Sequence, residues 1–82
     1  MTRDEIRRTV VDAILAFAPE ADFDGLDPRR PFREELDIDS FDFLNLVVAL
    51  HEKLGVDIPE ADYARLVSLQ DIVDYIAARV RP

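Results

Sequence analysis

The sequence contains no cysteine, only two glycines and a single histidine. Without cysteine the chain cannot form disulfides, a thiolate nucleophile or thiolate metal ligands, and with so little glycine it has no Gly-rich loop to bind phosphates. No apolar run approaches the ~20 residues of a membrane span, and the charged residues 1–5 do not resemble a signal peptide. We therefore expect a cytoplasmic protein that does not insert into membranes.

The chain is short, and this limits what it can bury. Its 82 residues suffice for a single domain, residues 1–82. A domain of this size buries only roughly 60–65% of the surface of its unfolded chain, which leaves little interior for a deep active site. We expect one thin core and a shallow functional surface.

Negative charge is concentrated in one part of the sequence. Residues 34–62 hold nine acidic residues against Lys53 and account for the whole net charge of −8. Such a segment repels nucleic acid and anionic membranes and suits a basic protein partner, and the alternative is a solvated acidic face that only aids solubility. The three arginines of residues 29–33 lie among acids, so we interpret them as a solvated loop rather than a nucleic-acid contact.

Capping signatures and apolar spacing predict helices near both ends. Thr2 with Glu5 precedes a helix over 3–18, which Pro19 ends, and Ser68 with Asp71 precedes a helix over 69–80. The expected core stripes of these two helices are Ile6, Val10, Ala13, Ile14 and Phe17, and Leu69, Ile72, Val73, Ile76 and Val80. Arg79 and Arg81 suit the negative end of the last helix.

Two further segments connect these ends. Residues 19–39 show no periodicity and predict a long loop, held down by Phe23, Leu26, Phe32, Leu36 and Ile38. After an extended link, Val56 to Pro59, with Val56 and Ile58 packed inward, Pro59 opens a short helix over 60–66, with Tyr63, Leu66 and Val67 as its expected contacts.

The helix predicted from Ser40 to Leu54, ended by Gly55, carries two apolar stripes. One stripe forms core, and it consists of Phe43, Leu46, Val47, Leu50 and Leu54. The other either binds a partner or is covered by the long loop, and it consists of Phe41, Leu44 and Val48. The predicted fold class is all-α: a four-helix bundle of three longer helices and one short one, with the long loop between the first two.

No group of residues is suited to catalysis, so we do not expect an enzyme. His51 lies roughly 16 Å along the helix from Ser40 at about 1.5 Å per residue, too far for a nucleophile and base pair. Asp37, Asp39 and Asp42 lack the glycine and terminal glutamate of a calcium loop, so no metal is expected. Ser40 is either a helix cap or first-turn residue, or an exposed hydroxyl where a helix N-terminus would favour an attached phosphate.

Several segments of the sequence resemble a known family, the acyl carrier proteins. Residues 36–42, Leu-Asp-Ile-Asp-Ser-Phe-Asp, resemble the family motif Leu-Gly-x-Asp-Ser-Leu-Asp, whose serine carries 4′-phosphopantetheine. Phe32, the linker Val56 to Pro59 and the segment Asp74-Tyr75-Ile76 are similar to the family too, so the likeness covers nearly the whole chain. Asp37 stands at the usual glycine, a position in which Asp tolerates a left-handed conformation.

The resemblance implies a mechanism and a set of site residues. A phosphopantetheinyl transferase attaches 4′-phosphopantetheine from coenzyme A to Ser40, beside Asp39, and the arm then delivers acyl thioesters to partner enzymes of fatty-acid, polyketide or related specialised biosynthesis. Acyl-loading and acyl-processing enzymes with basic surfaces are the expected partners of a monomeric carrier. The residues expected to contact them are Phe41, Asp42, Leu44, Asn45, Val48, His51 and Glu52.

Two alternatives stay open. Asn45 and His51 stand where fatty-acid carriers often have acids, and Phe41 and Phe43 make the site bulkier than usual, which favours a specialised stand-alone carrier. An aminoacyl or peptidyl carrier would use the same mechanism. In a different class, the chain would be a helical adaptor that binds through its acidic helix and is never modified.

Overall fold

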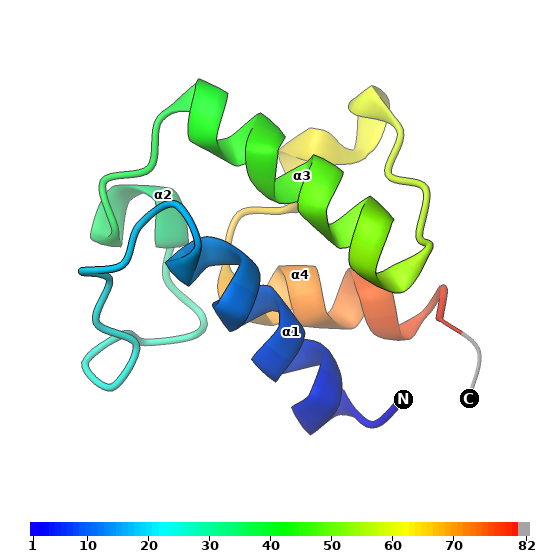
Figure 1. Ribbon diagram of the computed structural model, residues 1–82, viewed down its shortest axis with the longest axis horizontal. Helices are drawn as coiled ribbons and strands as arrows, with labels where there is room; N and C mark the ends of the chain where they lie inside the picture. Colours follow the sequence, from blue (N-terminus) through cyan, green and yellow to red (C-terminus); the bar gives the residue numbers. More distant parts are fainter. Residues whose placement is uncertain (81–82) are drawn as a thin grey trace.

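The computed structural model describes residues 1–80 and consists of helices joined by loops (Figure 1). Three longer helices are present with two short ones: α1 (Arg3–Leu15), α2 (Phe32–Glu35), α3 (Ser40–Leu54), the 3₁₀ helix η1 (Glu60–Arg65) and α4 (Leu69–Ala77). Across residues 1–80 no strand forms, and no helix is long and apolar enough to cross a membrane. The all-α prediction is confirmed.

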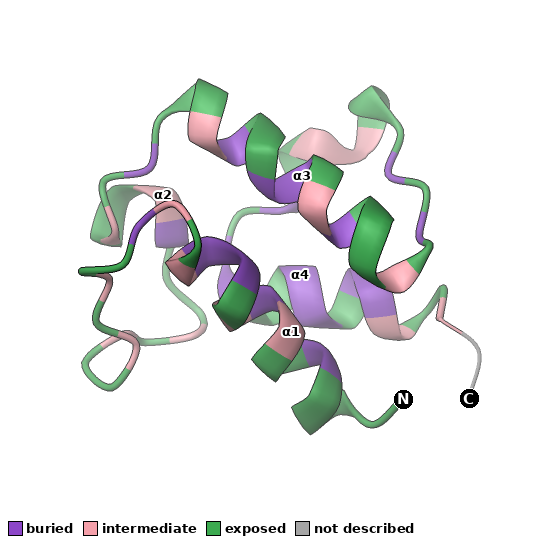
Figure 2. Ribbon diagram, in the orientation of Figure 1, coloured by how far each residue is buried: buried purple, intermediate pink, exposed green. Residues whose placement is uncertain are grey.

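The core lies where α1 packs against both α3 and α4 (Figures 1 and 2). Each long helix contributes one buried stripe, as its spacing predicted: Ile6, Val10, Ala13 and Ile14 from α1; Phe43, Leu46, Val47 and Leu50 from α3; Leu69, Ile72, Val73 and Ile76 from α4. Phe17, Leu54 and Val80, at or beyond the ends of these stripes, are only half-buried. Val56 and Ile58 in the link after α3 are buried as expected.

The first helix begins where predicted and ends earlier. Thr2 and Glu5 form the expected capping box, with the Glu5 amide donating to Thr2 Oγ1 over 3.1 Å. Regular α-helix stops at Leu15 rather than residue 18. A proline disfavours the α conformation of the residue before it, so the turn ahead of Pro19 tightens, and Phe17 donates to the Ile14 carbonyl at 3.2 Å.

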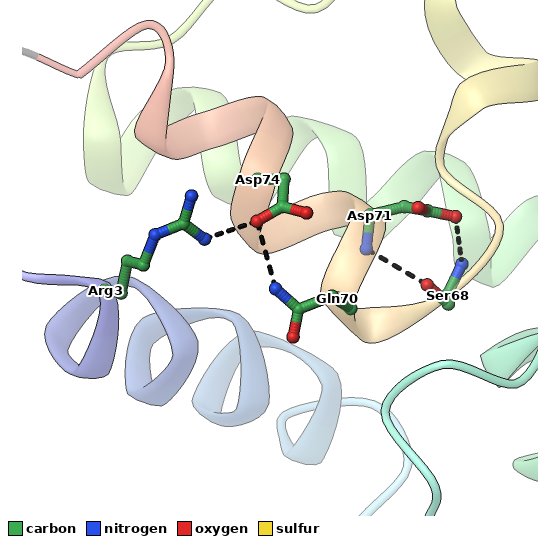
Figure 3. Close-up of polar contacts among 5 residues, drawn as sticks. All are labelled: Arg3, Ser68, Gln70, Asp71 and Asp74. Atoms are coloured by element: carbon green, nitrogen blue, oxygen red, sulfur yellow. Dashed lines mark hydrogen bonds and ion pairs between the residues drawn. The ribbon is translucent and has the colours of Figure 1, made fainter.

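The last helix has the second predicted capping box. Asp71 N donates to Ser68 Oγ at 3.0 Å, and Ser68 N donates to Asp71 Oδ2 at 3.1 Å (Figure 3). Regular α-helix ends at Ala77 rather than residue 80, because the chain there passes into tighter turns, as helix ends often do. Arg79 does bond to this end of the helix, donating to the Tyr75 carbonyl at 3.1 Å. Arg81 lies outside the described residues.

An ion pair joins the first helix to the last. The Arg3 guanidinium hydrogen-bonds to the Asp74 carboxylate, which also accepts from Gln70 Nε2 at 3.0 Å (Figure 3). The Arg3 hydrogen bond is the main reason that the pKa of Asp74 lies below its ordinary value of 3.8. Since both side chains are at least half exposed, solvent screens the pair and its contribution to stability is small.

The segment predicted as a continuous long loop contains a short helix, α2, that was not predicted from the sequence. α2 follows Pro31 and has Glu34 and Glu35 in its first turn, where acids favour a helix start. Its single turn is too short to show apolar periodicity, so no stripe could reveal it. The predicted anchors of the segment do pack on the core: Phe32 and Ile38 are buried, and Phe23, Leu26 and Leu36 are half-buried.

Backbone hydrogen bonds fix this segment to the connection between η1 and α4. Phe32 N donates to the Val67 carbonyl at 3.1 Å, and Gln70 N donates to the Pro28 carbonyl at 2.8 Å. Val67 itself was expected to contact the core, and this was wrong: its carbonyl faces Phe32 and its side chain is exposed. Leu66, next to it, is buried as predicted, and Tyr63 is half-buried.

A left-handed residue turns the chain from α2 into α3. Asp37 has φ 55°, the left-handed conformation that an aspartate can adopt. Ile38 N donates to the Arg33 carbonyl at 2.8 Å across this residue, which is the hydrogen bond of a Schellman motif with Leu36 as the C-cap. Burial of Ile38 holds the motif against the core.

We expect Asp37→Ala to lower the free energy of unfolding by about 1 kcal/mol, because alanine tolerates the left-handed conformation less well than aspartate. Asp37→Asn removes the same charge but keeps the tolerance, and it serves as the control. Denaturant unfolding of both variants checks the prediction. Equal stability of the two variants would contradict it.

Candidate functional site

Ser40 is the first residue of α3, and it is not the residue that caps the helix. Asp39, in extended conformation, is the N-cap, and its Oδ1 accepts from Asp42 N at 2.8 Å. Ser40 is therefore a first-turn residue rather than the cap; it is exposed to solvent, and its hydroxyl is not used in capping. A hydroxyl in this position is accessible to another molecule.

Arg33 contacts this hydroxyl, and this contact was not predicted from the sequence. Its Nη2 donates to Ser40 Oγ at 3.1 Å, its Nε donates to the Ile38 carbonyl at 3.4 Å, and its guanidinium carbon lies 5.0 Å from the centre of the Phe43 ring. The interpretation of Arg33 as a solvated loop residue was therefore wrong. The error arose because α2 was not predicted. The sequence signal that could have revealed this helix is a proline followed by acidic residues in the first turn.

An open groove runs from Ser40 along α3 and η1. It has a volume of about 460 Å³ and is lined by Arg33, Ser40, Phe43, Leu44, Glu60, Tyr63 and Ala64. The Phe43 and Tyr63 rings meet edge to face in its wall, with centroids 5.7 Å apart. A second groove, of about 530 Å³, shares Arg33, Tyr63 and Ala64 with the first. Both are open at the surface, and Ser40 lines the first of them.

The wall formed by η1 is held by a contact to α4. Tyr75 donates its hydroxyl proton to Asp62 Oδ2 over 2.6 Å, and the Arg79 guanidinium carbon lies 3.5 Å from the centre of the Tyr75 ring. Burial of Tyr75, with the hydrogen bond to Asp62, raises its pKa above the ordinary value of 10.0. The phenol therefore stays protonated and keeps donating to Asp62 at neutral pH.

The second apolar stripe of α3 is exposed. Phe41, Leu44 and Val48 are accessible to solvent, with Phe41 72% exposed, so the long loop does not cover them (Figure 2). Asn45 and Glu52 lie on the same side of the helix and are also exposed, whereas Asp42 is half-buried. The predicted partner residues thus share one helix, and most of them are accessible.

His51 lies at the opposite end of α3 from Ser40, so the structure does not bring the two together. Its Nδ1 is 3.2 Å from the Val56 carbonyl and 3.3 Å from Asp57 Oδ1. These contacts hold the end of the helix to the link that follows it. Among the 80 described residues, no three His, Asp or Glu side chains are arranged to hold a metal ion.

We expect alanine substitutions at the neighbouring Asp39 and Ser40 to separate capping from presentation. Asp39→Ala removes the cap and should lower the free energy of unfolding by about 1 kcal/mol. Ser40→Ala should change the free energy of unfolding by less than about 0.5 kcal/mol, because the hydroxyl is exposed and its hydrogen bond to Arg33 lies at the surface. Urea unfolding measures both. A larger loss in the serine variant than in the aspartate variant would contradict the assignment of the cap.

The chain is similar to known proteins over most of its length. A family model described as a phosphopantetheine attachment site matches residues 8–76. The acyl carrier protein of Thermosynechococcus vestitus is 36% identical over 80 residues, which cover 98% of each chain. The acyl carrier protein of Campylobacter hominis is 40% identical over 73 residues, covering 89% of this chain and 86% of the relative.

Proposed function

Because this chain belongs to the phosphopantetheine-binding acyl carrier protein family, we propose that Ser40 is the residue to which its arm is attached. The chain is an acyl carrier, and phosphopantetheine is its cofactor. The observation that carries the proposal is the exposed Ser40 hydroxyl, which opens onto a groove and is left free of capping by Asp39.

The start of α3 suits an attached phosphate. The first amides of a helix have no partner within it, and the helix dipole places partial positive charge there. Asp39 uses its carboxylate on the Asp42 amide, so it flanks Ser40 without covering it. When bound, the arm supplies the thiol that holds acyl groups as thioesters, which a chain without cysteine could not supply itself.

In the attachment reaction Ser40 is the acceptor. Its Oγ forms the new bond to phosphorus, the bond between that phosphorus and the nucleotide part of coenzyme A breaks, and the hydroxyl proton passes to the transferase. No residue of this chain needs to act as the base, in keeping with a carrier rather than a catalyst. We propose that Asp39, which flanks Ser40, contacts the transferase or its metal.

Intact-protein mass spectrometry after incubation with coenzyme A and a phosphopantetheinyl transferase tests this proposal. We expect one adduct on the wild-type protein and none on Ser40→Ala. Thr2→Ala is the matched control, because Thr2 is another hydroxyl residue at a helix start, and it should be modified normally. No adduct on folded wild-type protein would favour the unmodified adaptor instead, and an adduct that survives Ser40→Ala would refute the site.

The exposed face of α3 is the proposed docking surface for partner enzymes. It combines apolar side chains with the acidic surroundings of residues 34–62, so a partner with a basic surface fits it. We assign to it Phe41, Asp42, Leu44, Asn45, Val48, His51 and Glu52. The presence of Asn45, His51 and the bulky Phe41 favours a specialised stand-alone carrier, monomeric and cytoplasmic, over a housekeeping fatty-acid carrier; an aminoacyl or peptidyl carrier is the second candidate.

Two valines provide a matched test of this surface. Val48 on α3 is 54% exposed and Val67 before α4 is 46% exposed, so a serine substitution changes similar surface at each. We expect Val48→Ser to lower kcat/KM for the transferase about fivefold, because truncating an interface anchor costs about that much affinity. Val67→Ser should leave it unchanged. Equal effects of the two substitutions would argue against the α3 surface.

A further inference from the structure

Arg33 reaches the proposed attachment residue from a separate helix. It belongs to α2, and the Schellman turn at Asp37 folds the chain back so that Arg33 Nη2 lies 3.1 Å from Ser40 Oγ. The guanidinium has two further contacts, one to the Ile38 carbonyl and one to the face of the Phe43 ring. The group is therefore positioned before anything is attached to Ser40.

We propose that Arg33 binds the phosphate that links the arm to Ser40 and holds it at the boundary of the two grooves. The inference rests on the proposed function, since it requires the arm to be on Ser40. It assigns to Arg33 a positioning role: the side chain binds the linking phosphate and takes no part in forming or breaking the acyl thioester.

The negative charges around Ser40 would repel an attached phosphate, so a nearby cation would stabilise it. A phosphodiester on Ser40 adds a negative charge between Asp39 and Asp42, in a part of the chain that already carries the net charge of −8. The Asp39 carboxylate and the Asp42 amide already bond to each other. Like charges this close disfavour the phosphate unless a cation compensates them, and Arg33 is a cation in contact with Ser40.

The geometry of the guanidinium fits the task. Phosphorus would be bonded directly to Ser40 Oγ, so its free oxygens would lie only two bonds beyond an atom that Arg33 already contacts. Arginine has five N–H donors in a planar fork, and its two contacts to Ser40 and Ile38 leave donors for an anion. The neutral hydrogen bond to the hydroxyl would be exchanged for a charge-assisted one, which is stronger.

The position of Arg33 also bears on where the arm goes. Arg33 lines both grooves, the one that runs along α3 and η1 and the one beside α2, and both are walled by Tyr63 and Ala64. A phosphate held by Arg33 fixes the root of the arm where these grooves meet. Without Arg33 the root would be free to turn away from the protein.

The test compares holo and apo protein by denaturant unfolding, in the wild type and in Arg33→Met. Attachment should raise the equilibrium constant for folding about threefold in the wild type, the size expected of a partly exposed charge-assisted pair, and should lose that gain in Arg33→Met. Taking the holo-to-apo ratio within each variant cancels any general loss from removing the contacts to Phe43 and Ile38. Arg30→Met is the matched control, because Arg30 lies on the same segment and pairs with Glu35 instead.

A second readout reports on the phosphate directly. The phosphorus NMR shift of the attached arm should differ between wild type and Arg33→Met and should be the same in wild type and Arg30→Met, with Arg33→Lys in between. Equal holo-to-apo ratios and an unchanged phosphorus shift in Arg33→Met would overturn the role of Arg33 while leaving Ser40 as the attachment site. Mass spectrometry showing no arm on Ser40 would overturn both.

Discussion

The burial of Phe32 is the constraint on which the site depends. This side chain has no exposed surface, its ring lies 6.3 Å from that of Phe43 on α3, and its amide bonds to the carbonyl of Val67 before α4. One residue thus joins the middle segment to α3 and to the connection that leads into α4. Because Arg33 follows it directly and the Schellman turn begins within the same short helix, fixing Phe32 also fixes where Arg33 and Ser40 meet.

The domain divides α3 between stability and recognition. Its inner stripe is buried and α1 packs against the helix, and residues 1–80 form no further long helix with which to cover the outer stripe. An exposed phenylalanine such as Phe41 is unfavourable in water, so a surface of this kind points to a partner. Ser40 is the first residue of the same helix, so the proposed docking surface lies beside the proposed attachment site.

Charge has two roles around Ser40. The acids of residues 34–62 give the long-range field that suits basic partners, and their effect does not depend on the position of any one of them. Arg33 acts at contact distance. It is one charge among many in the chain, but its effect at Ser40 is large because its guanidinium touches that residue. Counting charges along the sequence describes the first role well and hides the second, since Arg33 looks there like part of a balanced loop.

The sequence by itself determined the all-α class, both capping boxes and the buried stripes of the long helices, because each depends on spacing or backbone preference within a few residues. Its resemblance to the family motif indicated the left-handed Asp37. It also singled out Ser40 through a local motif. Only the tertiary structure decided that α2 forms, that Val67 faces outward, that the outer stripe of α3 stays uncovered and that Arg33 reaches Ser40. The reason is physical: a one-turn helix has too few residues to show periodicity and is stabilised mainly by packing, and which side chains meet across a turn depends on how that packing closes.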